Sequence, residues 1–247
     1  MGLSTFYREA GPGRAGRFDT THWSLVLAAG RGEPEKAREA LQQLCEAYWY
    51  PLYVFARKQG HDPAESEDLT QDFFASLLRR RDLSQVCPER GRFRSILLRS
   101  LKHLLINEHH RRKTVKRGGR TDLLSLDAVE AEQRYRCEPA QRWTPESLFE
   151  RRWALTVLDR ATERIRDEYA RSERADLFET LKEFLSVPKP LAHAAIASRN
   201  EISISAVGVA IHRLRRRYAE ILREEISHTV GKPGDIEDEI YHLIAAA

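Results

Sequence analysis

Cysteine is scarce in this chain of 247 residues, which contains three: Cys45, Cys87 and Cys137. Their number is odd, they are widely spaced, and no two of them form a CxxC pair. The sequence therefore suggests neither a disulfide framework nor a zinc site. We expect three reduced thiols.

Long apolar runs are also missing. No segment approaches the roughly 20 apolar residues needed to span a bilayer, and the N-terminus has no signal-peptide core. Strand-like alternation of apolar and polar residues is absent, and no internal repeat is visible. We therefore expect a cytoplasmic, all-α protein that does not associate with a membrane.

The charge is unevenly distributed. The formal net charge is +4, and the sequence pI is about 9.0. Residues 91–120 carry ten Lys or Arg against one acid, a net charge of +9, and residues 205–223 carry five against one, a net charge of +4. Such surfaces suit a polyanion, because each cation placed on a phosphate releases condensed counterions. The alternative is two solvated helix faces.

A chain of this length forms one or two domains, and the periodic segments favour two. We expect two small helical domains joined by a linker. The boundaries are 1–33 for an N-terminal tail and short helix, 34–117 for the first domain, 118–147 for an irregular linker, 148–228 for the second domain, and 229–247 for a C-terminal tail helix.

The second domain has the pattern of a helix-turn-helix. A short apolar segment, Leu191–Ala197, is followed by a connection through Asn200 and then by a basic amphipathic helix. The apolar residues of that helix recur every three or four positions: Val207, Ile211, Leu214, Tyr218 and Leu222. Ser205, Val209, His212 and Arg216 lie on the opposite face. This pattern predicts a helix that lies on DNA.

The first domain is predicted to contain three amphipathic segments. The first begins near Pro34, and Pro51 makes it either a kinked helix or two abutting helices. The second runs from about Ala64 to Arg81. In the third, Arg92 to about Lys113, one face is apolar (Phe93, Leu97, Leu101, Leu104 and Leu105) and the other carries Arg92, Arg99, His103 and His110.

In this order, the segments resemble the bacterial RNA polymerase sigma factors of the extracytoplasmic-function (ECF) type, a branch of the sigma-70 class. Glu67–Phe73 resembles the region-2 helix, Phe93–Arg99 resembles the segment that opens promoter DNA, and Ala206–Leu214 resembles the region-4 recognition helix. The two predicted domains would then be sigma regions 2 and 4.

The resemblance implies that core RNA polymerase and promoter DNA are the partners. Polymerase binding would fall to Asp68, Gln71 and Asp72, although such a flank can also be merely solvated. The −10 strand would be held by Arg92, Arg99, Lys102 and His103, since cations track phosphates and a preceding loop can hold an unstacked base.

The −35 duplex would meet the second domain. The residues implied are Ser205, Val209, His212, Arg213 and Arg216. We expect His212 and Arg213 to contact phosphates, and Arg216 to contact a phosphate or a guanine edge. No catalytic residue, metal ligand or cofactor is expected.

The sequence departs from the family pattern at four positions. Ile96 stands where tryptophan is common, His103 where asparagine is common, and Glu201 where the turn commonly has glycine. Gly208 replaces a usual basic residue and weakens its helix by about 1 kcal/mol relative to alanine. These departures concern promoter readout rather than the class of protein.

Control of the factor by an anti-sigma protein or a Ser/Thr kinase is left open by the sequence. Thr70 lies between Asp68 and Asp72, where phosphorylation would add negative charge to the docking surface. The alternative, which we favour, is a helical threonine that bonds back to its own turn.

Two other functions are compatible with parts of the chain. A stand-alone helix-turn-helix regulator would use the second domain but leave the basic helix of the first unexplained. A metal-dependent nuclease or phosphotransferase using Glu67, Asp68 and Asp72 lacks a further ligand in the sequence.

Overall fold

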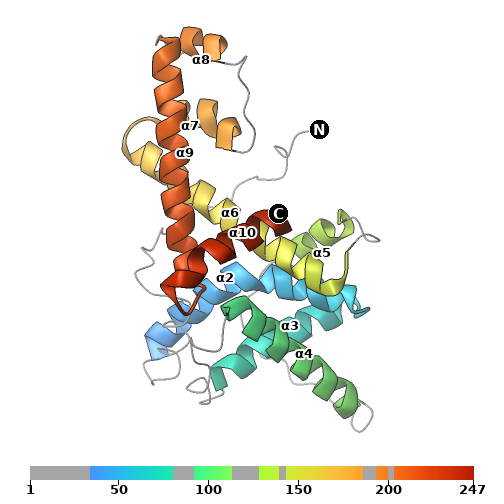
Figure 1. Cartoon of the computed structure of the whole chain (residues 1–247). Helices are drawn as coiled ribbons and strands as arrows, with labels where there is room; N and C mark the ends of the chain where they lie inside the picture. The colour runs from blue at the N-terminus through green and yellow to red at the C-terminus, as the bar shows by residue number, and fades with distance from the viewer. Residues whose placement is uncertain (1–33, 80–91, 113–127, 139–142, 186–192, 200–202) are drawn as a thin grey trace.

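The expected all-α fold is confirmed by a computed structural model, which describes residues 34–79, 92–112, 128–138, 143–185, 193–199 and 203–247. Within those ranges every regular element is a helix (Figure 1). The helices are α2 (Pro34–Lys58), α3 (Pro63–Arg79), α4 (Phe93–Arg112), α5 (Ala128–Arg136), α6 (Pro145–Arg171), α7 (Ala175–Leu181), α8 (His193–Arg199), α9 (Ile204–Ser227) and α10 (Ile236–Ala246), with 3-10 turns at Lys182–Leu185 and Pro233–Asp235. The short helix expected within residues 1–33 lies outside the described residues.

Helix α2 is a single helix that contains Pro51 in its interior. The alternative of two abutting helices at Pro51 is therefore wrong. Tyr48, Tyr53 and Phe55 of α2 have no exposed surface and contribute to the core. The extensive packing of α2 against α6 outweighs the loss of one backbone hydrogen bond at the proline.

One continuous core runs through the described part of the chain. It includes Leu52 of α2, Phe93 of α4, Trp153 of α6, Leu214 of α9 and Leu243 of α10. In Figure 1, α2, α3 and α4 lie at one end of the molecule, α8 and the start of α9 lie at the other, and α6 and α10 lie between them. The two basic helices are thus held in one packed body.

Helix α5 lies within residues 118–147, where the sequence indicated irregular structure. Its main attachment is Glu132, whose carboxylate accepts hydrogen bonds from Arg57 (2.9 and 3.0 Å) and from the Tyr53 hydroxyl (2.8 Å). Arg57 also lies over the Tyr135 ring at 4.8 Å. Contacts with α2 therefore stabilise a nine-residue helix that its own apolar pattern did not predict.

Candidate nucleic-acid interface

Helix α9 begins at a side-chain cap. The Ser203 hydroxyl accepts a hydrogen bond from the Ala206 amide at 3.1 Å, which satisfies one of the free amides at the helix start. The connection before it, residues 200–202, lies outside the described residues, so the departure at Glu201 has no structural account. Helix α8 packs against α9, as a helix-turn-helix requires.

The two faces of α9 separate as the periodicity predicted. Val207 and Leu214 are fully buried, and Ile211 is 6% exposed. All five residues expected to meet duplex DNA are exposed on the other side: Ser205, Val209, His212, Arg213 and Arg216. Gly208 has nothing within 4 Å of the position that a Cβ would occupy, so a longer side chain would fit there.

Two further arginines of α9 bond to other elements of the protein, although both keep exposed surface. Arg215 donates from Nε to the backbone carbonyl of Phe184 at 2.9 Å. Arg217 donates to both carboxylate oxygens of Glu168 on α6, at 2.6 and 2.8 Å. The sequence analysis did not assign these roles. The role of Arg217 could have been suspected, because Arg217 lies one turn before the buried Ile221 and therefore on the same side of the helix.

Helix α4 has the predicted division between an apolar and a cationic face. Phe93, Leu97 and Leu101 are at most 2% exposed, whereas Arg99 and His103 are exposed. Ser95, Ile106 and Asn107 are also exposed. The outer face of α4 can therefore be reached by a nucleic-acid strand, with the guanidinium of Arg99 and the imidazole of His103 at its centre.

Two of the four residues expected to bind the −10 strand are ion-paired within the protein. Lys102 Nζ lies 2.7 Å from Glu146 of α6, and Arg92 Nε lies 2.8 Å from Glu239 of α10. The hydrogen bond from Lys102 holds the pKa of Glu146 below its usual range. Among the described residues no carboxylate pairs with Arg99 or His103, so the four candidates are not equivalent.

Arg94 is buried, with a side chain 2% exposed. It pairs with Glu150 of α6 and Glu239 of α10, and its guanidinium lies 4.4 Å from the centre of the Trp153 ring. Burial lowers the pKa of Arg94. The sequence analysis missed the buried role of Arg94. Arg94 lies three residues before Leu97 and seven before Leu101, and this spacing places it on the apolar face of the helix.

Helix α3 presents the acidic surface expected to bind polymerase. Asp68 and Asp72 are exposed, and the half-buried Gln71 donates to Glu67 at 3.1 Å. Thr70, in contrast, is fully buried, and its hydroxyl donates to the Ser66 carbonyl at 2.7 Å. A kinase cannot reach this hydroxyl, so the structure argues against phosphorylation at Thr70 and supports the back-bonded alternative.

The sequence model of the ECF sigma factor family matches residues 33–201, more than half of the chain. The chain belongs to the ECF sigma factor family. Members bind RNA polymerase in transcription initiation, and they are DNA-binding regulators rather than enzymes. The match covers α2 to α8 and ends before α9, so the assignment of α9 rests on its own residues.

No curated protein and no solved structure matches the chain. None of the described helices is long and apolar enough to cross a membrane. Within the described residues, no three or more His, Cys, Asp or Glu side chains are grouped so that they could hold a metal ion.

Proposed function

We propose that this ECF sigma factor docks on core polymerase through the exposed Asp68 and Asp72 of α3, and reads promoters with two separate surfaces. The face of α4 around Arg99 and His103 acts on the melted −10 strand. The face of α9 formed by Ser205, Val209, His212, Arg213 and Arg216 binds the −35 duplex.

The observation that carries this proposal is the exposure of both cationic helix faces at opposite ends of one molecule (Figure 1). A surface helix ordinarily carries charged and polar residues on its outer side, and an excess of cations there suits a polyanion. A helix that enters the major groove needs an exposed N-terminal half, and α9 has one beyond the body formed by α6 and α10.

The polymerase assignment can be tested by reversing both charges in Asp68→Lys/Asp72→Lys. We expect this variant to retain its helix content but to lose binding to core polymerase and transcription in a reconstituted assay. Asp167→Lys/Asp238→Lys, which reverses a half-exposed acid of α6 and an exposed acid of α10, is the matched control and should retain both activities.

Unchanged polymerase affinity in the Asp68/Asp72 variant would overturn the docking assignment. If the wild-type protein binds duplex DNA but never co-elutes with core polymerase, the stand-alone regulator becomes the better description.

A further inference from the structure

Four arginines occupy five consecutive positions of α9, at 213, 215, 216 and 217, but the structure gives them different partners. Arg213 and Arg216 are exposed on the face proposed to bind duplex DNA. Arg215 bonds to the Phe184 carbonyl, and Arg217 bonds to Glu168. A cluster that looks uniform in sequence is therefore divided by its contacts, because Arg215 and Arg217 also bond to other elements of the protein.

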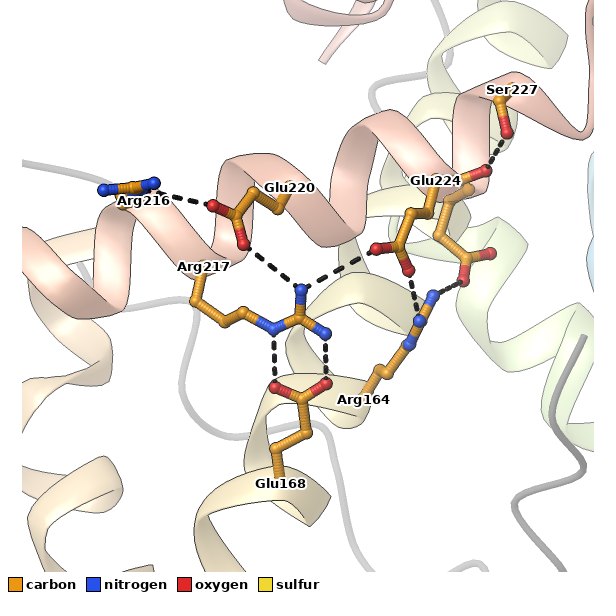
Figure 2. Close-up of polar contacts among 8 residues, drawn as sticks. Arg164, Glu168, Arg216, Arg217, Glu220, Glu224 and Ser227 are labelled. Atoms are coloured by element: carbon orange, nitrogen blue, oxygen red, sulfur yellow. Dashed lines mark hydrogen bonds and ion pairs between the residues drawn. The ribbon is translucent and has the colours of Figure 1, made fainter.

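The contact between Arg217 and Glu168 is the strongest of these by geometry. Nε and Nη2 of Arg217 donate to the two oxygens of one carboxylate at 2.8 and 2.6 Å (Figure 2). Paired parallel hydrogen bonds fix orientation as well as distance. Hydrogen bonding to Glu168 raises the pKa of Arg217, and the same contact holds the pKa of Glu168 below its usual range.

Two other arginines form contacts between α9 and its surroundings. Arg164, one turn before Glu168 on α6, pairs with Glu224 and Glu225 of α9 (Figure 2). Arg215 adds a bond to the 3-10 turn at Lys182–Leu185. Together with Arg217, these contacts hold α9 against rotation about its axis. Arg213 is only about 6 Å along the helix from Arg217, so a rotation there would move the DNA-binding side chains.

Glu220 links this framework to the DNA-binding face. Its carboxylate accepts hydrogen bonds from Arg217 Nη1 and from Arg216 Nε, each at 3.2 Å (Figure 2). Those bonds, with Arg217 the larger contributor, hold the pKa of Glu220 below its usual range. Arg216 keeps 76% of its side chain exposed while it is held, so it can still meet a phosphate.

We propose that Arg217 and Glu168 are a positioning pair that sets the angle of α9 on DNA. Glu220, which bonds to both Arg217 and Arg216, then fixes the position of the Arg216 side chain. The proposal rests on the proposed function of α9. Arg217 does not contact DNA, and Glu168 promotes DNA binding although its own charge repels phosphate.

The test uses two opposed effects of Glu168 on DNA binding. Its contact with Arg217 should strengthen binding, whereas its negative charge should weaken it. The full-length protein is titrated into a mixed-sequence DNA duplex at a series of salt concentrations, and the variants are Arg216→Ala, Arg217→Ala, Arg217→Lys, Glu168→Ala and Asp167→Ala. Asp167 is the neighbour of Glu168 on α6 and pairs only within its own helix in the contacts described, with Arg171. Helix content and thermal unfolding are measured for each variant.

Arg216→Ala should weaken binding and reduce the slope of log affinity against log salt by about 0.9, because one phosphate contact is lost. Arg217→Ala and Glu168→Ala should weaken binding by about three- to tenfold with the slope unchanged. Arg217→Lys should resemble Arg217→Ala, since an ammonium keeps the charge but cannot form the two parallel bonds. Asp167→Ala should bind as tightly as wild type, or slightly more tightly.

Tighter binding with a steeper slope in Glu168→Ala would overturn the proposal, because it would show that Glu168 withholds Arg217 from phosphate. Wild-type affinity in Arg217→Lys would also overturn it, by showing that charge alone matters. If Glu168→Ala fails to fold, the DNA affinity of Arg217→Lys alone tests the positioning role of the pair. Wild-type affinity and slope in Arg216→Ala would instead contradict the assignment of α9 to DNA.

Discussion

Arg94 at the start of α4 and Glu239 of α10 form a buried ion pair across 145 residues of sequence. The side chain of Glu239 has no exposed surface, and Arg92 shares its carboxylate. Through this pair, α10 holds the first turn of the helix proposed to act on the −10 strand. The remainder of α4 extends away from α10 (Figure 1).

Removing one partner of this pair should destabilise the protein strongly. Glu239→Ala leaves a buried cation with less compensation, and we expect a loss of about 3–5 kcal/mol in the free energy of unfolding in urea. Glu237 is on the same helix as Glu239 and forms an exposed ion pair with Arg223 of α9. Glu237→Ala should change the free energy of unfolding by at most about 1 kcal/mol. Equal losses in the two variants would contradict the anchoring role of Glu239.

Substitutions should distinguish the roles of the two surfaces proposed to bind DNA. Arg216→Ala should weaken binding to a double-stranded −35 fragment by about three- to tenfold. Arg99→Ala should leave that binding unchanged but reduce open-complex formation, measured by the chemical reactivity of unpaired thymines in a holoenzyme–promoter complex. The division of roles is wrong if both substitutions weaken duplex binding to the same extent.

Lys102 should become more available when its partner is neutralised. Glu146→Gln removes a half-exposed ion pair, with side chains 42% and 46% exposed, so the fold should tolerate it. We expect binding to a single-stranded oligonucleotide to tighten by about two- to fivefold. The double variant Glu146→Gln/Lys102→Ala should lose the gain. Persistence of the gain would show that Lys102 does not contact the strand.

Acid should weaken the attachment of α5. Hydrogen bonds from Arg57 hold the pKa of Glu132 below its usual range, so the folded protein binds this proton less readily than the unfolded chain. The stabilising contribution of Glu132 is complete above about pH 4.5 and falls as the pH drops further, through the lowered pKa. The difference in unfolding free energy between wild type and Glu132→Gln should therefore shrink below that pH. A constant difference from pH 7 to pH 3 would rule this out.

Glycine should be favoured at two helix ends, so adding it at one and removing it at the other should change stability in opposite directions. Glu173 follows α6 with φ of 56°, and Gly60 follows α2 with φ of 97°. Glu173→Gly should stabilise the protein by about 1 kcal/mol, and Gly60→Ala should destabilise it by a similar amount, since both positions require the left-handed region. Gly60 has open space around it, so the backbone alone would cause the loss. Chemical denaturation measures both changes, and equal signs would contradict the argument.

The helical faces of α4 and α9 could be predicted because apolar spacing reports which side packs. Val207, Ile211 and Leu214 were placed correctly without a structure, and so were the exposed Arg99 and Arg213. The class of protein also followed from the order of these segments.

The partners of charged residues could not be predicted in the same way. Sequence shows that Arg94 and Arg217 are cations, but not that carboxylates 145 and 49 residues away lie within reach. Helix α5 was missed for a related reason, because Glu132 stabilises it through contacts with another helix. At Thr70, spacing placed the residue between two exposed acids, whereas packing buried it.

The separation of Arg94 and Glu239 also has a consequence for biosynthesis. A ribosome adds about 5–20 residues per second, so roughly 7–30 s pass between the synthesis of Arg94 and that of its partner. During that interval a growing chain already contains α4 but cannot form the buried pair between Arg94 and α10. A message cut short between codons 228 and 238 would direct the synthesis of both helices proposed to bind DNA without the α10 residue that pairs with Arg94.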